Sequence, residues 1–202
     1  MKPGDSFTNP ITGMRVTVLQ TTTETDGRAV AVEYRLRPHS GREFTLAHRH
    51  RIYVERFEII AGQAAYACDD EERSAAAGET VVIPLNTTHI HPWNIGDEEL
   101  VVRHTTEAIR PDRETLDAAL LGAETLFGLA HEGKVDANGR ANPLQMAVLF
   151  NALLPNSYLP NVSLPVQRVL FAALAGLGRL LGYRLTYERF AMRTDTVAPF
   201  AS

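Results

Sequence analysis

The chain has 202 residues, of which 45% are hydrophobic and 22% charged, with a formal net charge of −4. This length and composition fit one globular domain with a sizeable core. The acidic balance and the scattered arginines argue against a nucleic-acid partner. Cys68 is the single cysteine, which excludes an intrachain disulfide, and residues 1–6 lack the apolar run of a signal peptide. We therefore expect a cytoplasmic protein.

The first part of the chain is predicted to form two strands after an irregular lead-in over residues 1–13. Residues 14–21 alternate weakly between apolar and polar side chains, which favours a strand. Asp26-Gly27 accepts the positive φ angles of a tight hairpin turn. The next strand has a clear inward face, made by Val30, Val32, Tyr34 and Leu36.

Residues 41–62 contain the densest group of polar side chains on an inward face. Side chains two apart in a strand share one face of the sheet. His48 and His50 therefore lie together, and Glu55 has the inward parity of the next strand. The apolar neighbours with the same parity are Phe44 and Leu46 in the first strand, and Tyr53, Phe57 and Ile59 in the second.

Two imidazoles and a carboxylate on an apolar face require a partner, because an unpaired buried polar group costs roughly 2–7 kcal/mol. A metal ion satisfies all three groups at once. The alternative is a buried hydrogen-bonded network of His48, His50 and Glu55 without a metal.

Four further segments complete the predicted β region. Residues 63–68 read as a short strand, and the acidic residues 69–73 as a solvated loop. Residues 78–84 form a strand that ends at Pro84, and the turn over residues 86–88 leads to His89 and His91. Because Pro92 lacks a backbone donor, we expect an irregular path there. In the last strand, the inward face is made by Leu100, Val102, His104 and Thr106.

At Pro111 the period of the apolar residues changes from two to about three and a half. The first helical stripe consists of Leu116, Leu120, Ala123, Phe127 and Ala130. Asn142-Pro143 predicts the start of a second helix, which runs to about Leu154. Residues 155–160 are expected to be a loop, and Ser163 predicts the start of a third helix. The third stripe consists of Val166, Leu170, Ala173, Leu177 and Leu180. With only a thin basic face, this helix is expected to pack on the barrel or on a partner subunit rather than on a membrane.

Strands followed by helices predict an α+β protein that is mainly β. We expect a β-barrel over residues 1–110 and a helical extension of about three helices over residues 111–202, packed on the barrel or on a dimer partner.

Two motifs in this pattern resemble those of the cupin superfamily, and in particular single-domain bacterial cupins with a helical extension. His48-x-His50-x4-Glu55-x6-Gly62 matches the first cupin motif. Gly78-x5-Pro84-x-Asn86-x2-His89 resembles the second, except that Asn86 stands where glycine is usual and Asn94 comes one position late. Asparagine tolerates the left-handed conformation that a glycine would take there.

The resemblance implies a jelly-roll barrel (a double-stranded β-helix) and one divalent transition metal, either Fe, Mn, Ni, Cu or Zn. It implies that His48, His50, Glu55 and His89 are the ligands, that two positions of an octahedron stay open, and that the protein is a homodimer. We expect His89 rather than His91 to complete the set.

His91 and His104 are then candidates for proton transfer near the metal. Each is alternatively a core histidine. Tyr53, Phe57 and Trp93 are predicted to contact the substrate, in a pocket that Phe44, Leu46, Leu100 and Val102 also surround.

Three functions remain open on the sequence alone. The first is a metal-dependent oxygenase, of the dioxygenase kind, that acts on a small organic molecule. The second is a non-redox, metal-dependent isomerase or lyase. The third is a small-molecule binding protein without turnover.

Overall fold

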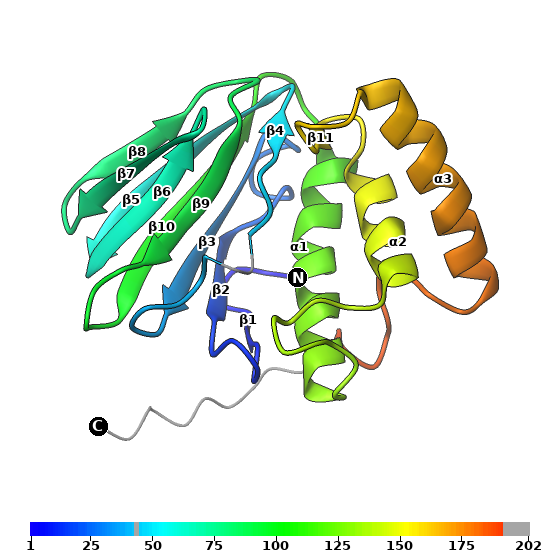
Figure 1. The fold of residues 1–202 in the computed structure, drawn as a ribbon, viewed down its shortest axis with the longest axis horizontal. Helices are drawn as coiled ribbons and strands as arrows, with labels where there is room; N and C mark the ends of the chain where they lie inside the picture. The colour runs from blue at the N-terminus through cyan, green and yellow to red at the C-terminus, as the bar shows by residue number, and fades with distance from the viewer. Residues whose placement is uncertain (43–44, 192–202) are drawn as a thin grey trace.

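A computed structural model describes residues 1–42 and 45–191 of the chain, and Figure 1 shows its fold. The early strands are β1 Ser6–Thr8, β2 Arg15–Gln20, β3 Ala29–Leu36, β4 Arg49–His50, β5 Tyr53–Ala61 and β6 Gln63–Cys68. The later strands are β7 Glu71–Ala76, β8 Thr80–Ile83, β9 His89–Asn94, β10 Leu100–Ala108 and β11 Ser157–Tyr158. The helices are α1 Arg113–His131, α2 Pro143–Leu153 and α3 Leu164–Leu180.

The strands form two main antiparallel sheets. One has six strands in the order β1-β2-β3-β10-β5-β8, and the other has three in the order β7-β6-β9. From β5 onward the chain crosses repeatedly between the sheets: β5 lies in the first, β6 and β7 in the second, β8 in the first, β9 in the second and β10 in the first. These crossings produce the jelly-roll barrel that the sequence predicted.

Two tight turns bear out the conformations expected from the sequence. Asp26 and Gly27 both have positive φ angles, of 51° and 74°, and the Arg28 N–H donates to the Thr25 carbonyl at 3.0 Å, so the expected tight turn forms. The whole connection between β2 and β3 is longer than a two-residue hairpin loop, because it runs over residues 21–28. Asn86 has a φ of 60°, so asparagine does take the left-handed conformation at the position where glycine is usual.

Some local predictions were wrong. Part of the lead-in forms β1, which pairs with β2, and part of the acidic loop forms β7, which pairs with β6. The strand expected to lead up to His50 is confined to Arg49–His50. Residues 155–160, expected to be a loop, contain β11, which pairs with β4.

The helices lie side by side, with α1 against the barrel and α3 on the outside (Figure 1). Leu116, Leu120 and Phe127 of α1 belong to the same apolar cluster as the inward residues of the barrel strands. The rings of Phe127 and Phe7 pack edge to face at 5.3 Å. The first helix thus completes the barrel core, and the division at residue 110 stays a prediction.

The stripe predicted for α3 faces outward, so its expected packing is not seen in this chain. Val166 and Leu180, at the two ends of the stripe, have exposed fractions of 54% and 85%. The buried residues of α3 are Gln167, Ala175 and Gly178. Small residues allow the close approach to α2, where a Cβ on Gly178 would meet the Leu144 carbonyl oxygen at 3.0 Å. The homodimer stays a prediction.

Across residues 1–42 and 45–191, none of the helices has the length and apolar character needed to cross a membrane.

Candidate metal centre

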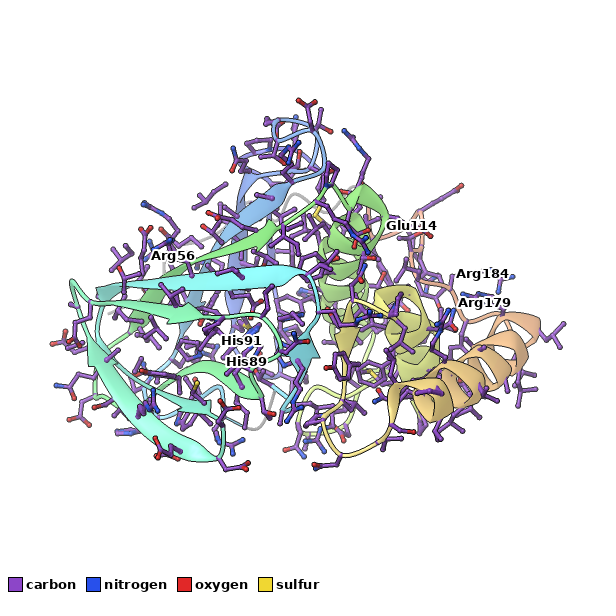
Figure 2. All side chains as sticks on the ribbon, turned by 90° about the horizontal axis from the view of Figure 1, so that it is seen from above. Arg56, His89, His91, Glu114, Arg179 and Arg184 are labelled. Atoms are coloured by element: carbon purple, nitrogen blue, oxygen red, sulfur yellow. The ribbon has the colours of Figure 1, made fainter. Side chains whose placement is uncertain are left out.

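Five side chains converge inside the barrel: His48, His50, Glu55, His89 and His91. One ligand atom from each lies within 4.8 Å of those of the other four. The group therefore contains all four predicted ligands and also the histidine predicted to lie beside them. Figure 2 shows His89 and His91 close together in the barrel interior.

Backbone pairing brings the two cupin-like motifs together at this point. His48 and His89 exchange two backbone hydrogen bonds, with N···O distances of 3.1 Å and 3.0 Å. The Asn86 backbone N–H donates to the His50 carbonyl at 2.7 Å. The turn that ends at His89 is thus tied to the segment that carries His48 and His50.

Hydrogen bonds at the Nδ1 atoms orient three of the imidazoles. His48 Nδ1 lies 2.8 Å from the Leu46 carbonyl oxygen, and His89 Nδ1 lies 3.1 Å from that of Thr87. His50 Nδ1 lies 2.9 Å from Ser157 Oγ. A proton on Nδ1 leaves the Nε2 lone pair free, as metal ligation requires.

Glu55 presents its two carboxylate oxygens to different partners. Oε2 lies 3.3 Å from His50 Nε2, 2.6 Å from His89 Nε2 and 3.4 Å from His91 Nε2. Oε1 lies 2.9 Å from His104 Nε2 and 3.4 Å from Thr106 Oγ1. One oxygen therefore faces the histidine cluster, while the other is anchored by the neighbouring strand.

The converging atoms fit a metal ion. His50 Nε2, His89 Nε2, His91 Nε2 and Glu55 Oε2 are all buried and make no hydrogen bond of acceptable geometry. Buried polar atoms are normally satisfied, so four unsatisfied atoms at one point indicate a missing partner. A divalent cation could be that partner, because imidazole and carboxylate are suitable ligands, whereas the metal-free network would leave these atoms without hydrogen bonds of acceptable geometry. The ligand types do not select among iron, manganese, nickel, copper and zinc.

The ionisation of the cluster suits a cation. Burial lowers the pKa of His48 well below its ordinary value, and burial lowers the pKa of His91 to about 4. Burial would also lower the pKa of His89, but the adjacent Glu55 carboxylate raises it above its ordinary value, an effect that a cation bound between the two groups would oppose. Burial would raise the pKa of Glu55, but His50, His91 and His104 keep it well below its ordinary value. Neutral imidazoles and an ionised carboxylate are the forms that bind metals.

A β-bulge places His91 in the cluster. Trp93 pairs with Ala65 while Ile90 pairs with Ala67, so β9 uses one residue more than β6 between these pairs. The bulge accommodates Pro92 within β9, so the path is irregular there, as the sequence predicted. Both His89 and His91 reach Glu55 Oε2, and the choice of His89 as the fourth ligand stays a prediction.

Ser157 is a site residue that the sequence analysis missed. It lies in β11, beyond α2, and it reaches the cluster because β11 pairs with β4. Its hydroxyl lies next to His50 Nδ1 although the two residues are 107 positions apart. A serine in a predicted loop carries no pattern that would single it out.

Strands distributed between two sheets, with a histidine and glutamate cluster inside the barrel, are the architecture that the two cupin-like motifs predicted. The chain has a cupin fold. The predicted fold class, a mainly β cupin barrel followed by helices, is confirmed.

No family model matches the chain, and no curated protein matches it. A predicted oxalate decarboxylase from Thermotoga maritima is 17% identical, with 48% of this chain and 81% of that chain covered and a TM-score of 0.43. An RmlC-like cupin from Shewanella frigidimarina is 15% identical over 55% and 86% of the two chains, with a TM-score of 0.42. A Cupin 2 conserved barrel domain protein from Salinispora arenicola is 21% identical over 48% and 78%, with a TM-score of 0.39.

Two apolar cavities flank the cluster of histidines and Glu55 in this barrel. The barrel cavity, of about 220 Å³, lies between β1–β3 and α1 and includes His91 and His104 in its wall. The helix cavity, of about 310 Å³, lies between the helices and β11 and includes His48 and His91. The cluster is therefore open to apolar space on two sides.

The aromatic residues predicted to contact a substrate lie elsewhere. Tyr53, Phe57 and Trp93 are buried, and none of them lines the two cavities. The Tyr53 hydroxyl donates to Asp112, Phe57 stacks on His104 at 4.3 Å, and Arg42 lies over Trp93. Each ring supports a neighbouring group instead of the cavity wall. Leu46 does line the helix cavity, whereas Phe44 lies outside the described residues.

Proposed function

We propose that this cupin is a metal-dependent oxygenase that acts on a small apolar organic molecule. The observation that carries the proposal is the position of the cluster on the walls of two cavities whose described lining includes no Asp, Glu, Lys or Arg. Pockets of a few hundred Å³ with apolar walls and few polar groups are typical of small-molecule sites.

The lining favours oxidation over the isomerase or lyase alternative. A substrate with a carboxylate or phosphate would need a cationic group in the wall or a bond to the metal ion, because an unpaired buried charge is costly. Introduction of oxygen at the C–H bonds of an uncharged apolar molecule, or cleavage of its C=C bonds by oxygen, requires an oxidant, whereas isomerisation of a C=C bond does not. A bound redox metal with an open position supplies a site for dioxygen, whereas zinc supplies Lewis-acid chemistry.

The residues of the chain have separate parts in this proposal. His48, His50, Glu55 and His89 would bind the metal ion. His91 lies in the walls of both cavities, with its Nε2 3.4 Å from Glu55 Oε2, and His104 orients Glu55 from the barrel cavity. The helices cover the cluster and exclude water from the reacting groups.

A binding protein without turnover is the second candidate, and the number of converging ligands favours it. If His91 joins the other four, five protein ligands leave one position of an octahedron open instead of two. Dioxygen and a coordinating substrate cannot then bind to the metal together.

The test is elemental analysis of protein purified without added metal, followed by dioxygen uptake after loading with iron, manganese, nickel, copper or zinc. A panel of uncharged aromatic, terpenoid and alkyl compounds supplies substrates. We expect substrate-dependent uptake with a redox metal, none with zinc, and none in Glu55→Gln. Glu58→Gln is the matched control, because Glu58 lies on the same strand but pairs with Arg103 on the outer face.

Turnover of a panel compound by the zinc-loaded protein, without dioxygen uptake, would instead support the isomerase or lyase. Binding of panel compounds without any turnover would support the binding protein.

A further inference from the structure

The two cavities meet at one point beside the cluster. Four residues line both of them: Thr45, His91, Ala119 and Ala123. Ala119 and Ala123 are four positions apart on α1, so they lie on the same helical face. The cavities, here called the barrel arm and the helix arm, thus lie next to each other at a junction formed by His91 and these two alanines.

Several polar groups of the two arms contact the cluster near this junction, and Tyr158 adds a hydroxyl to the wall of the helix arm. His104 and Thr106 in the barrel arm contact Glu55, and His48 in the helix arm belongs to the cluster. Farther out, Tyr34 donates to the Pro92 carbonyl at 3.2 Å. Gln167 donates to the carbonyls of Leu159 and Val162 and accepts from the Leu159 N–H. Their polar atoms are therefore already engaged with the backbone.

We infer that the arms form one substrate pocket, and that the substrate is an elongated, uncharged molecule that reacts at an interior atom. This inference rests on the proposed function for the reaction itself. An apolar segment on each side of the reacting atom fills one arm, and burial of each methylene group contributes about 0.8 kcal/mol. A molecule that reacts at its end leaves the other arm without apolar contacts.

Ala119 and Ala123 determine whether both arms are used. Their methyl groups leave space at the junction, where a larger side chain from α1 would separate the arms. Ala119 is exposed to this space, so a substitution there extends into the cavity without displacing packed neighbours.

The experiment measures binding of two isomeric ketones to the zinc-loaded full-length protein by calorimetry. Dipentyl ketone has its carbonyl at the centre of the chain, and methyl nonyl ketone has it next to one end. The two have equal apolar content, so a difference in affinity reports the position of the polar group. We expect dipentyl ketone to bind about tenfold more tightly, as the burial of two more methylene groups would produce.

Ala119→Phe is expected to remove this preference. It should lower the affinity for dipentyl ketone about tenfold while leaving the affinity for methyl nonyl ketone nearly unchanged. Ala123→Leu is a second variant at the same junction, for use if the first does not fold. Ala172→Phe is the matched control, because Ala172 is an exposed helical alanine on α3 that lines neither cavity. We expect it to retain the preference.

Equal affinities for the two ketones, absence of binding by both, or an unchanged preference in both junction variants would overturn the inference. None of these measurements requires turnover. Failure of the oxygenase proposal would therefore appear as absent dioxygen uptake while the preference for dipentyl ketone remained.

Discussion

His104 Nε2 lies 2.9 Å from Glu55 Oε1, the carboxylate oxygen that faces away from the four histidines of the cluster. The same ring stacks on Phe57, with centroids 4.3 Å apart and an interplanar angle of 14°. The imidazole is thus fixed on one face by an aromatic ring and at one nitrogen by the carboxylate. Because Oε2 is the oxygen that converges with the histidine Nε2 atoms, His104 sets the direction in which Glu55 presents it.

Replacing His104 by alanine is therefore expected to weaken metal binding without removing a ligand. Loss of a group that orients a ligand typically costs about 10–100-fold in metal affinity. Competition between the protein and a chelator for zinc measures the change. His39→Ala is the control, since His39 pairs with Asp97 at the surface and its side chain is 64% exposed. Equal zinc affinity in the two variants would show that His104 does not act through Glu55.

The alanine variants of His89 and His91 separate the two candidates for the remaining ligand. We expect His89→Ala to empty the site, because its ring is buried and its Nε2 lies closer to Glu55 Oε2. His91→Ala is expected to retain most of its metal at saturating concentration, since its side chain is 25% exposed at the cavity wall. Elemental analysis after dialysis measures occupancy, and the reverse result would assign His91 as the ligand.

The barrel and the cluster could be predicted from the sequence because their determinants are local. Alternation places His48 and His50 on one face, and the spacing to Glu55 matches the first cupin motif. The conformational tolerance of Asn86 explains why the second motif still forms its turn. These inferences need only neighbouring residues and the period of a strand.

Other parts of the site depend on pairings between distant segments. Ser157 contacts His50 only because β11 pairs with β4, and the two cavities exist only because α1 lies against β1–β3. The prediction of which face of α3 is buried was wrong for a related reason. Helical periodicity identifies an apolar stripe, but the residues that contact α2 are on the face of Gln167, Ala175 and Gly178, where the helices approach closely.

A pair of leucine substitutions tests whether the helical extension is independent of the barrel. Leu116 of α1 is 1% exposed within the barrel core, whereas Leu180 of α3 is 85% exposed. Leu116→Ala is expected to lower the free energy of unfolding by about 2–5 kcal/mol, and Leu180→Ala by less than about 0.5 kcal/mol. Denaturant unfolding measures both. A second, unchanged transition from the barrel in Leu116→Ala would contradict the shared core.

Asp112 joins three parts of the chain just before α1. Its carboxylate accepts hydrogen bonds from the Tyr53 hydroxyl in β5, from Asn156 before β11, and from the Thr115 N–H in the first turn of α1. Burial would raise its pKa, but these hydrogen bonds lower the pKa below its ordinary value of 3.8. Asp112→Ala removes the cap of α1 and leaves the buried Tyr53 hydroxyl without its acceptor. The substitution is expected to lower the free energy of unfolding by about 2 kcal/mol.

The pH dependence of that cost follows from the direction of the shift. Because the folded-state pKa is the lower one, the unfolded chain binds more protons as the pH falls through 3.8. The carboxylate's contribution is therefore complete at neutral pH and disappears as the pH falls through the folded-state pKa. The free energy of unfolding of the metal-free wild type and of Asp112→Ala can be measured between neutral and acidic pH. The difference between the two should decrease only at the acidic end of this range. Asp97→Ala is the control, because its carboxylate is 97% exposed, and it should differ from wild type by less than about 0.5 kcal/mol throughout. An Asp112→Ala cost that stayed constant down to the acidic limit would mean that the cap geometry, rather than the carboxylate charge, stabilises this junction.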